Sequence, residues 1–127
     1  MYKACIFDLD GTIAYTVESM AYVGNQVLEE FGLSALPVEH YNFYAGDGAD
    51  ELVRRMLADT PGGDTADYEQ IRTVYRQKFA QNPFYHVKPF DGILELLGEL
   101  KKENIRIAVL SNKPHEAAIE VVNKIFG

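Results

Sequence analysis

Two runs of apolar residues, one near each end of the chain, predict β-strands. Residues 4–7 are apolar at every position, and residues 105–110 repeat this pattern with Arg106 as the exception. A strand that is apolar on both of its alternating faces is typical of a parallel sheet, which helices cover on both sides. The two runs therefore predict an α/β fold with buried parallel strands.

Between the two runs, apolar residues recur every three or four positions, which predicts helices. Gly32 suits the end of the first helix, Pro37 can open a short one, and Asp47 is expected to cap the next. Asn82-Pro83 should end the last of them. The positions that define the three longer helices are Val17, Met20, Ala21, Gly24, Leu28 and Phe31; Leu52, Val53, Met56 and Leu57; and Tyr68, Ile71, Tyr75 and Phe79. Helical spacing explains the last set fully as core packing.

The remaining segments predict a helix on each side of the second strand. Asp91 should cap a helix that ends near Asn104, and Pro114 should start the final helix. The order strand, helix, strand, helix belongs to a parallel α/β sheet. We therefore predict a core of residues 1–15 and 83–127 and a helical cap of residues 16–82, joined by hinges near 14–16 and 82–88.

The hexapeptide Phe-Asp-Leu-Asp-Gly-Thr, residues 7–12, places two carboxylates directly after the first strand. Two like charges at the end of a buried strand repel each other, so a bound cation or a reaction is expected there. Ligands of parallel sheets bind beyond the carboxyl ends of the strands, where residues 111–114 (Ser-Asn-Lys-Pro) follow the second strand. The first loop suits Mg²⁺ and the second suits a phosphate group. Together they indicate phosphoryl transfer.

The composition excludes several other classes of function. The chain has 127 residues, 47% of them apolar, and a formal net charge of -7, so it offers no basic field for nucleic acid or an anionic membrane. No apolar stretch approaches the roughly 18 residues of a membrane span. The single Cys5 allows no disulfide framework, and a reducing cytoplasm is the expected location.

These motifs resemble those of the haloacid dehalogenase superfamily. The FDLDGT segment and the later VLSNKP segment are similar to its motifs I and II, and the helical insertion is similar to its C1 caps. Residues 44–49 and 89–93 resemble the cap loop and the return segment of its phosphoglycolate phosphatase group. The resemblance covers the whole chain and implies a Rossmann-like parallel core with an inserted helical cap.

The resemblance also implies roles for the residues of motif I. Asp8 would attack phosphorus to form an aspartyl-phosphate and would bind Mg²⁺. Asp10 would serve as acid and base and would bind the metal through its backbone carbonyl. Gly11 would permit a close approach of the phosphate and Thr12 would hold Asp10 in place.

The second loop and the cap complete the implied site. Ser111 and the Asn112 amide would bind the phosphoryl oxygens. Gly11, Thr12 and Lys113 are also expected to contribute to the phosphate site. Lys113 is expected to be a structural or peripheral group rather than the catalytic lysine, which the resemblance places later. The cap residues expected to shape substrate choice are Tyr44, Gly46, Asp47 and Gly48, although Asp47 could equally be only a helix cap.

The resemblance has two departures. Tyr15 stands where many relatives carry an aspartate, which bears on substrate choice. The motif III lysine and motif IV acidic residues would both follow Gly127, so we expect a chain that is part of a protein of roughly 200 residues or more. Two unpaired sheet edges would then favour self-association, and this segment alone should turn over little substrate.

The predicted function is a Mg²⁺-dependent phosphatase acting on a small, phosphoglycolate-like metabolite. Two alternatives stay open from the residues. One is a phosphomutase of the β-phosphoglucomutase type, which shares motif I and the cap. The other is a non-catalytic module that keeps the fold and acts through protein contacts.

Overall fold

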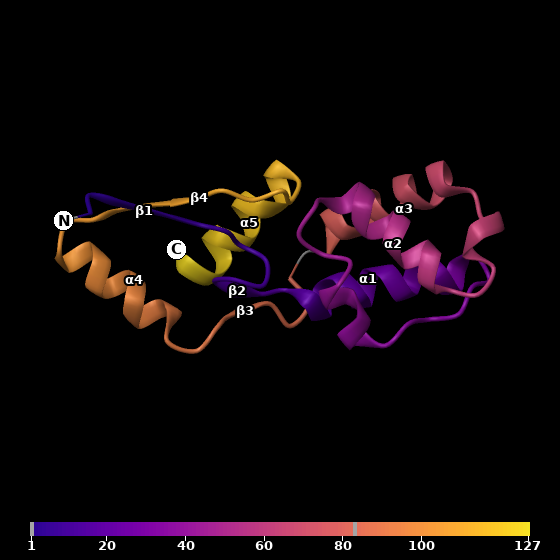
Figure 1. The fold of residues 1–127 in the computed structure, drawn as a ribbon, viewed down its shortest axis with the longest axis horizontal. Coiled ribbons are helices and arrows are strands. Elements are labelled where there is room, and N and C mark those ends of the chain that lie inside the picture. The colour runs from indigo at the N-terminus through magenta and orange to yellow at the C-terminus, as the bar shows by residue number, and fades with distance from the viewer. Residues whose placement is uncertain (1, 83) are drawn as a thin grey trace.

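A computed structural model describes residues 2–82 and 84–127 of the chain. In chain order its elements are β1 (Ala4–Phe7), β2 (Ala14–Tyr15), α1 (Val17–Glu30), the 3-10 helix η1 (Val38–Asn42), α2 (Ala49–Asp59), the 3-10 helix η2 (Gly63–Thr65), α3 (Tyr68–Gln81), β3 (Lys88–Pro89), α4 (Ile93–Lys102), β4 (Arg106–Val109) and α5 (His115–Phe126). The molecule is elongated, with α1, α2 and α3 at one end and β1, β4, α4 and α5 at the other (Figure 1).

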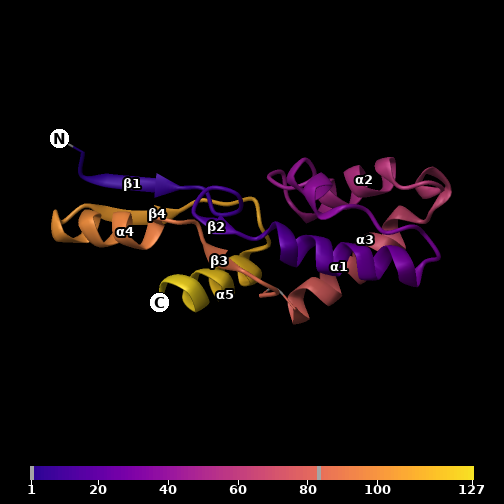
Figure 2. The same cartoon turned by 90° about the horizontal axis from the view of Figure 1, so that it is seen from below.

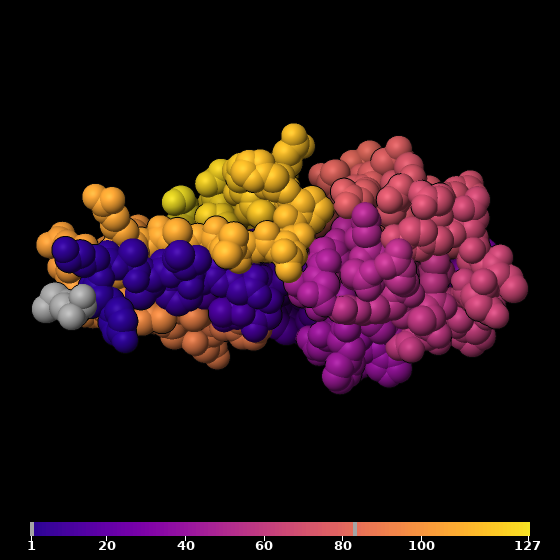
Figure 3. Space-filling view, turned by 45° about the horizontal axis from the view of Figure 1, so that its top comes forward, coloured from indigo at the N-terminus to yellow at the C-terminus, as the bar shows by residue number. Residues whose placement is uncertain are grey.

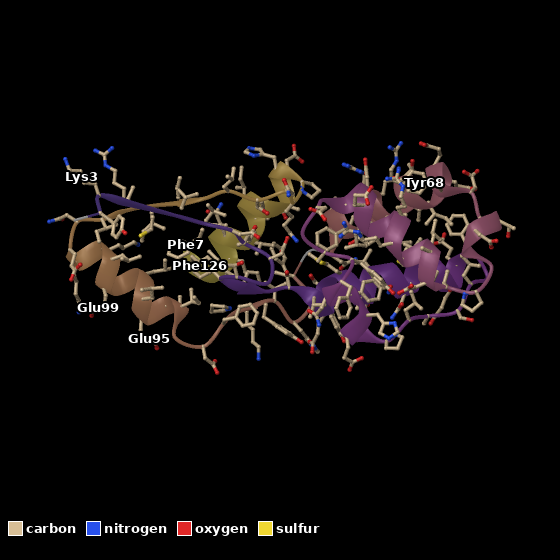
Figure 4. The ribbon with its side chains drawn as sticks, in the orientation of Figure 1. Lys3, Phe7, Tyr68, Glu95, Glu99 and Phe126 are labelled. Carbon is tan, nitrogen blue, oxygen red and sulfur yellow. The ribbon has the colours of Figure 1, made fainter. Side chains whose placement is uncertain are left out.

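The two predicted strands form one parallel sheet. Ala4 of β1 pairs with Arg106 of β4, and Phe7 pairs with Val109. Below this sheet, α5 contributes Val121 to a small core with Leu9 and Ile13, which are almost completely buried. Phe7 and Phe126 both pack against that core (Figure 4). The α/β fold class is therefore confirmed.

The prediction that helices cover both faces of the sheet is wrong for the described structure. Ile6 of β1 is 70% exposed and Leu110, directly after β4, is 73% exposed. Helix α4 has no buried residue, and Leu94 and Leu96 on it are largely exposed. Its Glu95 and Glu99 point away from the sheet (Figure 4). Apolar side chains of this end thus remain open to solvent because no described element packs on them.

The helices at the other end enclose a second core. Almost completely buried residues from α1, η1, α2 and α3 form most of it, as the apolar spacing predicted, and Ala117 of α5 also belongs to it. A Cβ atom at Gly24 would lie 2.6 Å from the Tyr41 hydroxyl oxygen, so Gly24 is what admits this ring. The Tyr41 hydroxyl donates to Asn25 Oδ1 at 2.8 Å, which satisfies it inside the core.

Two helix caps differ from the prediction. Asp47 and Asp91 were expected to cap α2 and α4, but Gly48 and Gly92 occupy the N-cap positions, with φ of 93° and 86°. Only glycine adopts this left-handed region without strain. The Asp47 carboxylate instead pairs with Arg55 on the surface of α2.

A short antiparallel pair that the sequence did not predict joins the two ends of the molecule. Ala14 of β2 pairs with Pro89 of β3, and Tyr15 pairs with Lys88 (Figure 2). These two strands are the segments along which the chain leaves and re-enters the sheet region. The domain boundaries and hinges placed near them stay predictions, and the predicted helix end at Pro83 falls outside the described residues, although α3 does end at Gln81.

Candidate active site

The first carboxylate loop is a tight turn anchored by one buried residue. The Leu9 side chain is fully buried, and its carbonyl oxygen accepts hydrogen bonds from the backbone N–H groups of Thr12, Ile13 and Ala14 at 3.0–3.2 Å. Gly11 adopts a φ of 77°, which this turn requires. Leu9 is buried between Asp8 and Asp10. The two aspartates therefore lie on the same side of the turn, where both line one cavity.

Asp10 is held by two donors that meet at a single oxygen. Thr16 Oγ1 donates to Asp10 Oδ1 at 2.6 Å, and Lys113 Nζ donates to the same oxygen at 3.1 Å. Among the described residues nothing donates to Asp10 Oδ2. The expected role of Thr12 as the residue that holds Asp10 is wrong here, because the Thr12 side chain is exposed and Thr16, buried at 2% exposure, makes the contact.

Lys113 lies at the centre of the site rather than at its periphery. Its side chain is 2% exposed, and its Nζ lies 4.6 Å from the centroid of the Phe79 ring. Burial lowers the pKa of Lys113, and the neighbouring Asp10 carboxylate opposes that shift. The ammonium therefore bridges a carboxylate of the core and an aromatic ring of the cap, a position that its sequence context did not indicate.

The two loops meet at one edge of the sheet, as the parallel pairing requires. Leu9 N–H donates to Asp8 Oδ1 at 2.8 Å, and Lys113 N–H donates to Ser111 Oγ at 3.1 Å. The Asn112 side-chain amide donates across to the Gly46 carbonyl oxygen of the cap at 2.9 Å. In Figure 3, the yellow-orange atoms that follow β4 lie against the purple and magenta atoms of the cap.

A space of about 30 Å³, here named the inner cavity, lies between the core loops and the cap. A cavity of this size holds about two water molecules. Its core wall consists of Asp8, Asp10, Ser111, Asn112, Lys113 and Pro114, and its cap wall consists of Met20, Ala45, Gly46, Gly48, Ala49, Leu52, Tyr75 and Phe79. A second cleft of about 240 Å³ is lined by Asp10, Gly11, Tyr15 and Thr16, among other residues.

Two of the four expected cap residues line the inner cavity. Gly46 and Gly48 do so with φ of 110° and 93°, and a Cβ atom at Gly48 would lie 3.3 Å from the Asn112 carbonyl oxygen. Asp47 points to the surface. Tyr44 turns into the cap core, where burial and its hydrogen bond to Asp59 raise its pKa.

Sequence reasoning missed Tyr75 and Phe79 as site residues, because their helical spacing accounted for them as core packing. Both are almost completely buried, yet both line the inner cavity. No property of the spacing distinguishes the turn of α3 that meets the core loops from the turns that do not.

The donor set fits a hard divalent cation. No group of three or more His, Cys, Asp or Glu side chains gathers anywhere in the described ranges 2–82 and 84–127. Mg²⁺ needs only one or two carboxylates and keeps several water molecules. The Asp8 carboxylate and the Asp10 backbone carbonyl are the groups of this chain that could hold it.

Comparison with known proteins decides the family. The family model described as haloacid dehalogenase-like hydrolase matches residues 5–125. The chain belongs to this family. The resemblance seen in FDLDGT and SNKP is thereby confirmed.

Curated relatives carry the name phosphoglycolate phosphatase. The chain is 28% identical over 122 residues to the protein from Thiobacillus denitrificans, and the aligned segment covers 94% of this chain and 54% of that protein. It is 32% identical over 126 residues to the protein from Pseudomonas syringae pv. syringae, and the aligned segment covers 97% of this chain and 46% of that protein. The chain thus spans about half the length of the curated relatives it matches.

A solved structure supports the same fold. The crystal structure from Lactobacillus delbrueckii subsp. bulgaricus, whose name assigns it to the phosphoglycolate phosphatases, matches with a TM-score of 0.84 and 29% identity. The match covers 98% of this chain and 61% of that one. No helix among the described residues is long and apolar enough to span a membrane.

Proposed function

We propose that this chain supplies the nucleophile, the acid/base residue and the phosphate loop of a Mg²⁺-dependent phosphatase for a small phosphorylated metabolite. The observation that supports this most strongly is the 3.1 Å contact between Lys113 Nζ and Asp10 Oδ1, which joins the acidic loop after β1 to the loop after β4. Carboxylates facing a cation and fixed donors suit phosphoryl transfer, in which charge develops on the phosphoryl oxygens.

In the proposed first step, a carboxylate oxygen of Asp8 attacks the phosphorus atom, and the bond from phosphorus to the leaving oxygen breaks. Asp10 donates a proton to that oxygen, so the alcohol leaves in its neutral form. Asp8 Oδ1 already accepts the Leu9 N–H, so Oδ2 is the oxygen available for attack. The step ends with the phosphoryl group bonded to Asp8.

In the proposed second step, Asp10 takes a proton from a water molecule, whose oxygen attacks the phosphorus atom. The bond from phosphorus to Asp8 breaks, and inorganic phosphate and the Asp8 carboxylate are released. Thr16 and Lys113 both bind Oδ1 of Asp10, which orients the carboxylate and leaves Oδ2 for both proton transfers.

The other site residues would bind and orient the phosphoryl group. Ser111, the Asn112 amide and the Lys113 ammonium would donate to its oxygens, and Gly11 would let it approach the backbone. A bound Mg²⁺, held by Asp8 and the Asp10 carbonyl, would offset negative charge on those oxygens. The names of the relatives support a phosphoglycolate-like substrate for the whole protein.

The test is the substitution Asp8→Asn in the full-length gene product, including any residues that follow Gly127. We expect turnover to fall by orders of magnitude, because the amide is a poor nucleophile, while the unfolding midpoint stays close to that of the wild type. Asp91→Asn is the matched control, since Asp91 is an exposed carboxylate outside the site. Beryllofluoride with Mg²⁺ should bind at the Asp8 carboxylate. Substantial hydrolysis by Asp8→Asn would refute the proposal.

A further inference from the structure

The cap wall of the inner cavity is almost wholly apolar. Met20 of α1, Leu52 of α2 and Phe79 of α3 line it, with small residues of the loop that precedes α2. Among the described residues, no lysine, arginine or histidine of the cap lines this cavity. The part of a substrate that faces the cap would therefore meet few groups able to bind a polar atom.

Among the described residues, Tyr75 supplies the one side-chain hydroxyl of that wall. Its side chain is 2% exposed, and its ring stacks on Phe79 with the centroids 5.8 Å apart. The hydroxyl forms no hydrogen bond within the described residues. Tyr75 lines the inner cavity, which is the space where a bound molecule could meet this hydroxyl.

The surroundings keep Tyr75 a hydrogen-bond donor. Burial raises the pKa of Tyr75, and the neighbouring Tyr41 and Asp10 raise it further. The phenol therefore keeps its proton throughout the neutral range and can donate to an oxygen of a bound molecule. A donor without an acceptor among the described residues, inside an apolar wall, favours a ligand that brings one acceptor to that point.

We propose that Tyr75 is a specificity-determining residue of the proposed phosphatase, and that its hydroxyl donates a hydrogen bond to the polar end, a carboxylate or a hydroxyl, of a leaving group with two or three carbons. This inference rests on the proposed phosphatase function and adds the residue that would select among substrates of the phosphoglycolate-like class. A hexose would turn several hydroxyls toward Met20, Leu52 and Phe79, where they would lose their hydrogen bonds to water without replacement. A compact leaving group also requires the smallest displacement of the cap from the arrangement seen here.

The experiment measures kcat/KM of the full-length gene product for four esters: phosphoglycolate, 2-hydroxyethyl phosphate, n-propyl phosphate and glucose 6-phosphate. Tyr75→Phe removes only the hydroxyl and keeps the ring stacked on Phe79. We expect it to lower kcat/KM for the first two esters by about ten- to hundredfold, with a clearly smaller loss for n-propyl phosphate. The first two esters also separate a carboxylate from a hydroxyl as the bound group.

Tyr68→Phe is the matched control on the same helix. The Tyr68 hydroxyl donates to the Asp50 carbonyl oxygen at 3.2 Å and lies on the outer side of the cap (Figure 4). This variant should hydrolyse all four esters as the wild type does. A second variant, Leu52→Ala, enlarges the same wall and should raise the rate for glucose 6-phosphate relative to phosphoglycolate by about tenfold.

Two further results separate this inference from the proposed function. Inorganic phosphate should inhibit Tyr75→Phe and the wild type with equal Ki, because the phosphate loop is untouched. If the wild type hydrolyses none of the esters, the phosphatase proposal fails. Calorimetric binding of phosphoglycolate then decides the inference: weaker binding to Tyr75→Phe supports it, and equal binding overturns it. Equal losses for all esters, or none, would also overturn the role of Tyr75.

Discussion

At the scale of single residues, the arrangement around Asp10 shows how a short motif depends on distant partners. Thr16 Oγ1 and Lys113 Nζ approach the same oxygen of Asp10, one from the start of α1 and the other from the loop after β4. The carboxylate is thereby fixed in orientation while its second oxygen stays available. Hydrogen bonds to a charged group in a partly buried site are stronger than those between neutral groups, so each donor matters for the geometry.

We predict that Thr16→Val lowers kcat by about ten- to hundredfold with little change in KM, because it removes the donor that orients Asp10 and keeps the branched shape of the side chain. Steady-state kinetics of the full-length protein test this, with the thermal unfolding midpoint as a check of folding. Thr12→Val is the matched comparison, since the Thr12 side chain is exposed, and its effect on kcat should be clearly smaller. A larger loss from Thr12→Val would restore the role first expected for that residue.

At the scale of elements, the contacts between cap and core are few and small. The Asn112 amide bonds to the Gly46 carbonyl, the Lys113 ammonium lies over Phe79, and β2 pairs with β3 along only two residues each. Tyr22 of α1 stacks on Tyr85 at 4.0 Å between ring centroids, beside the return segment. Such contacts can break and re-form, which a lid over an active site requires.

We predict that the cap rotates relative to the core about residues 14–16 and 82–88, because these segments are where the chain crosses between them. Glu69 on the cap and Glu99 on α4 are exposed, with 72% and 66% of their side chains accessible, so cysteines at these positions can carry spin labels. In a Cys5→Ser background, the distance between the labels should shorten or narrow in distribution when beryllofluoride and Mg²⁺ are added. A pair of labels placed within the cap at Glu69 and Glu39 is the control. Structures with the cap rotated about other segments would contradict the prediction.

At the scale of the whole molecule, the two cores have different characters. The cap core buries aromatic rings, among them Tyr41, Tyr44 and Tyr75, whereas the sheet leaves Ile6 and Leu110 open to solvent. Buried tyrosines make the free energy of unfolding vary with pH in the alkaline range. Exposed apolar surface makes the state of association depend on protein concentration. Both consequences can be measured.

We predict that the free energy of unfolding falls as the pH rises above about 10.5. Burial raises the pKa of Tyr41, Tyr44 and Tyr75, so the unfolded chain releases these protons first, starting near its ordinary value of 10.0, and deprotonation then favours unfolding. Lys113 acts in the opposite direction. Burial lowers its pKa, so its contribution to the free energy of unfolding rises with pH up to about 10.5. Three tyrosines outweigh one lysine. Urea titrations between pH 8 and 11.5 test this, and Tyr44→Phe should flatten the decline.

We also predict that the polypeptide 1–127 self-associates at micromolar concentrations, because Ile6, Leu110 and Leu94 expose apolar side chains on the sheet and α4. Sedimentation velocity should show species larger than the monomer. Leu110→Glu should shift them toward the monomer, because a carboxylate resists burial. Val38→Glu, at an exposed position of the cap, is the control and should change nothing. A monomer at all concentrations would contradict the prediction.

Much of the fold followed from local patterns in the sequence. Continuous apolar runs predicted β1 and β4, helical spacing predicted the three cap helices, and the insertion after the first strand followed from their order. The placement of Asp8 and Asp10 near Ser111 and Lys113 also followed, because the carboxyl ends of parallel strands meet at one edge of a sheet. These features depend on periodicity and on sheet geometry, both of which short stretches of chain carry.

Tertiary structure alone decided the features that depend on which surfaces meet. Thr16 rather than Thr12 reached Asp10 because the turn around Leu9 directs the start of α1 toward the site. Gly48 and Gly92 replaced the expected aspartate caps because the loops before α2 and α4 enter with positive φ. Tyr75 and Phe79 became cavity residues because one turn of α3 faces the loop at Lys113. Helical spacing reports only that a side chain is buried, and the surface that buries it is set by the packing of segments far apart in the chain.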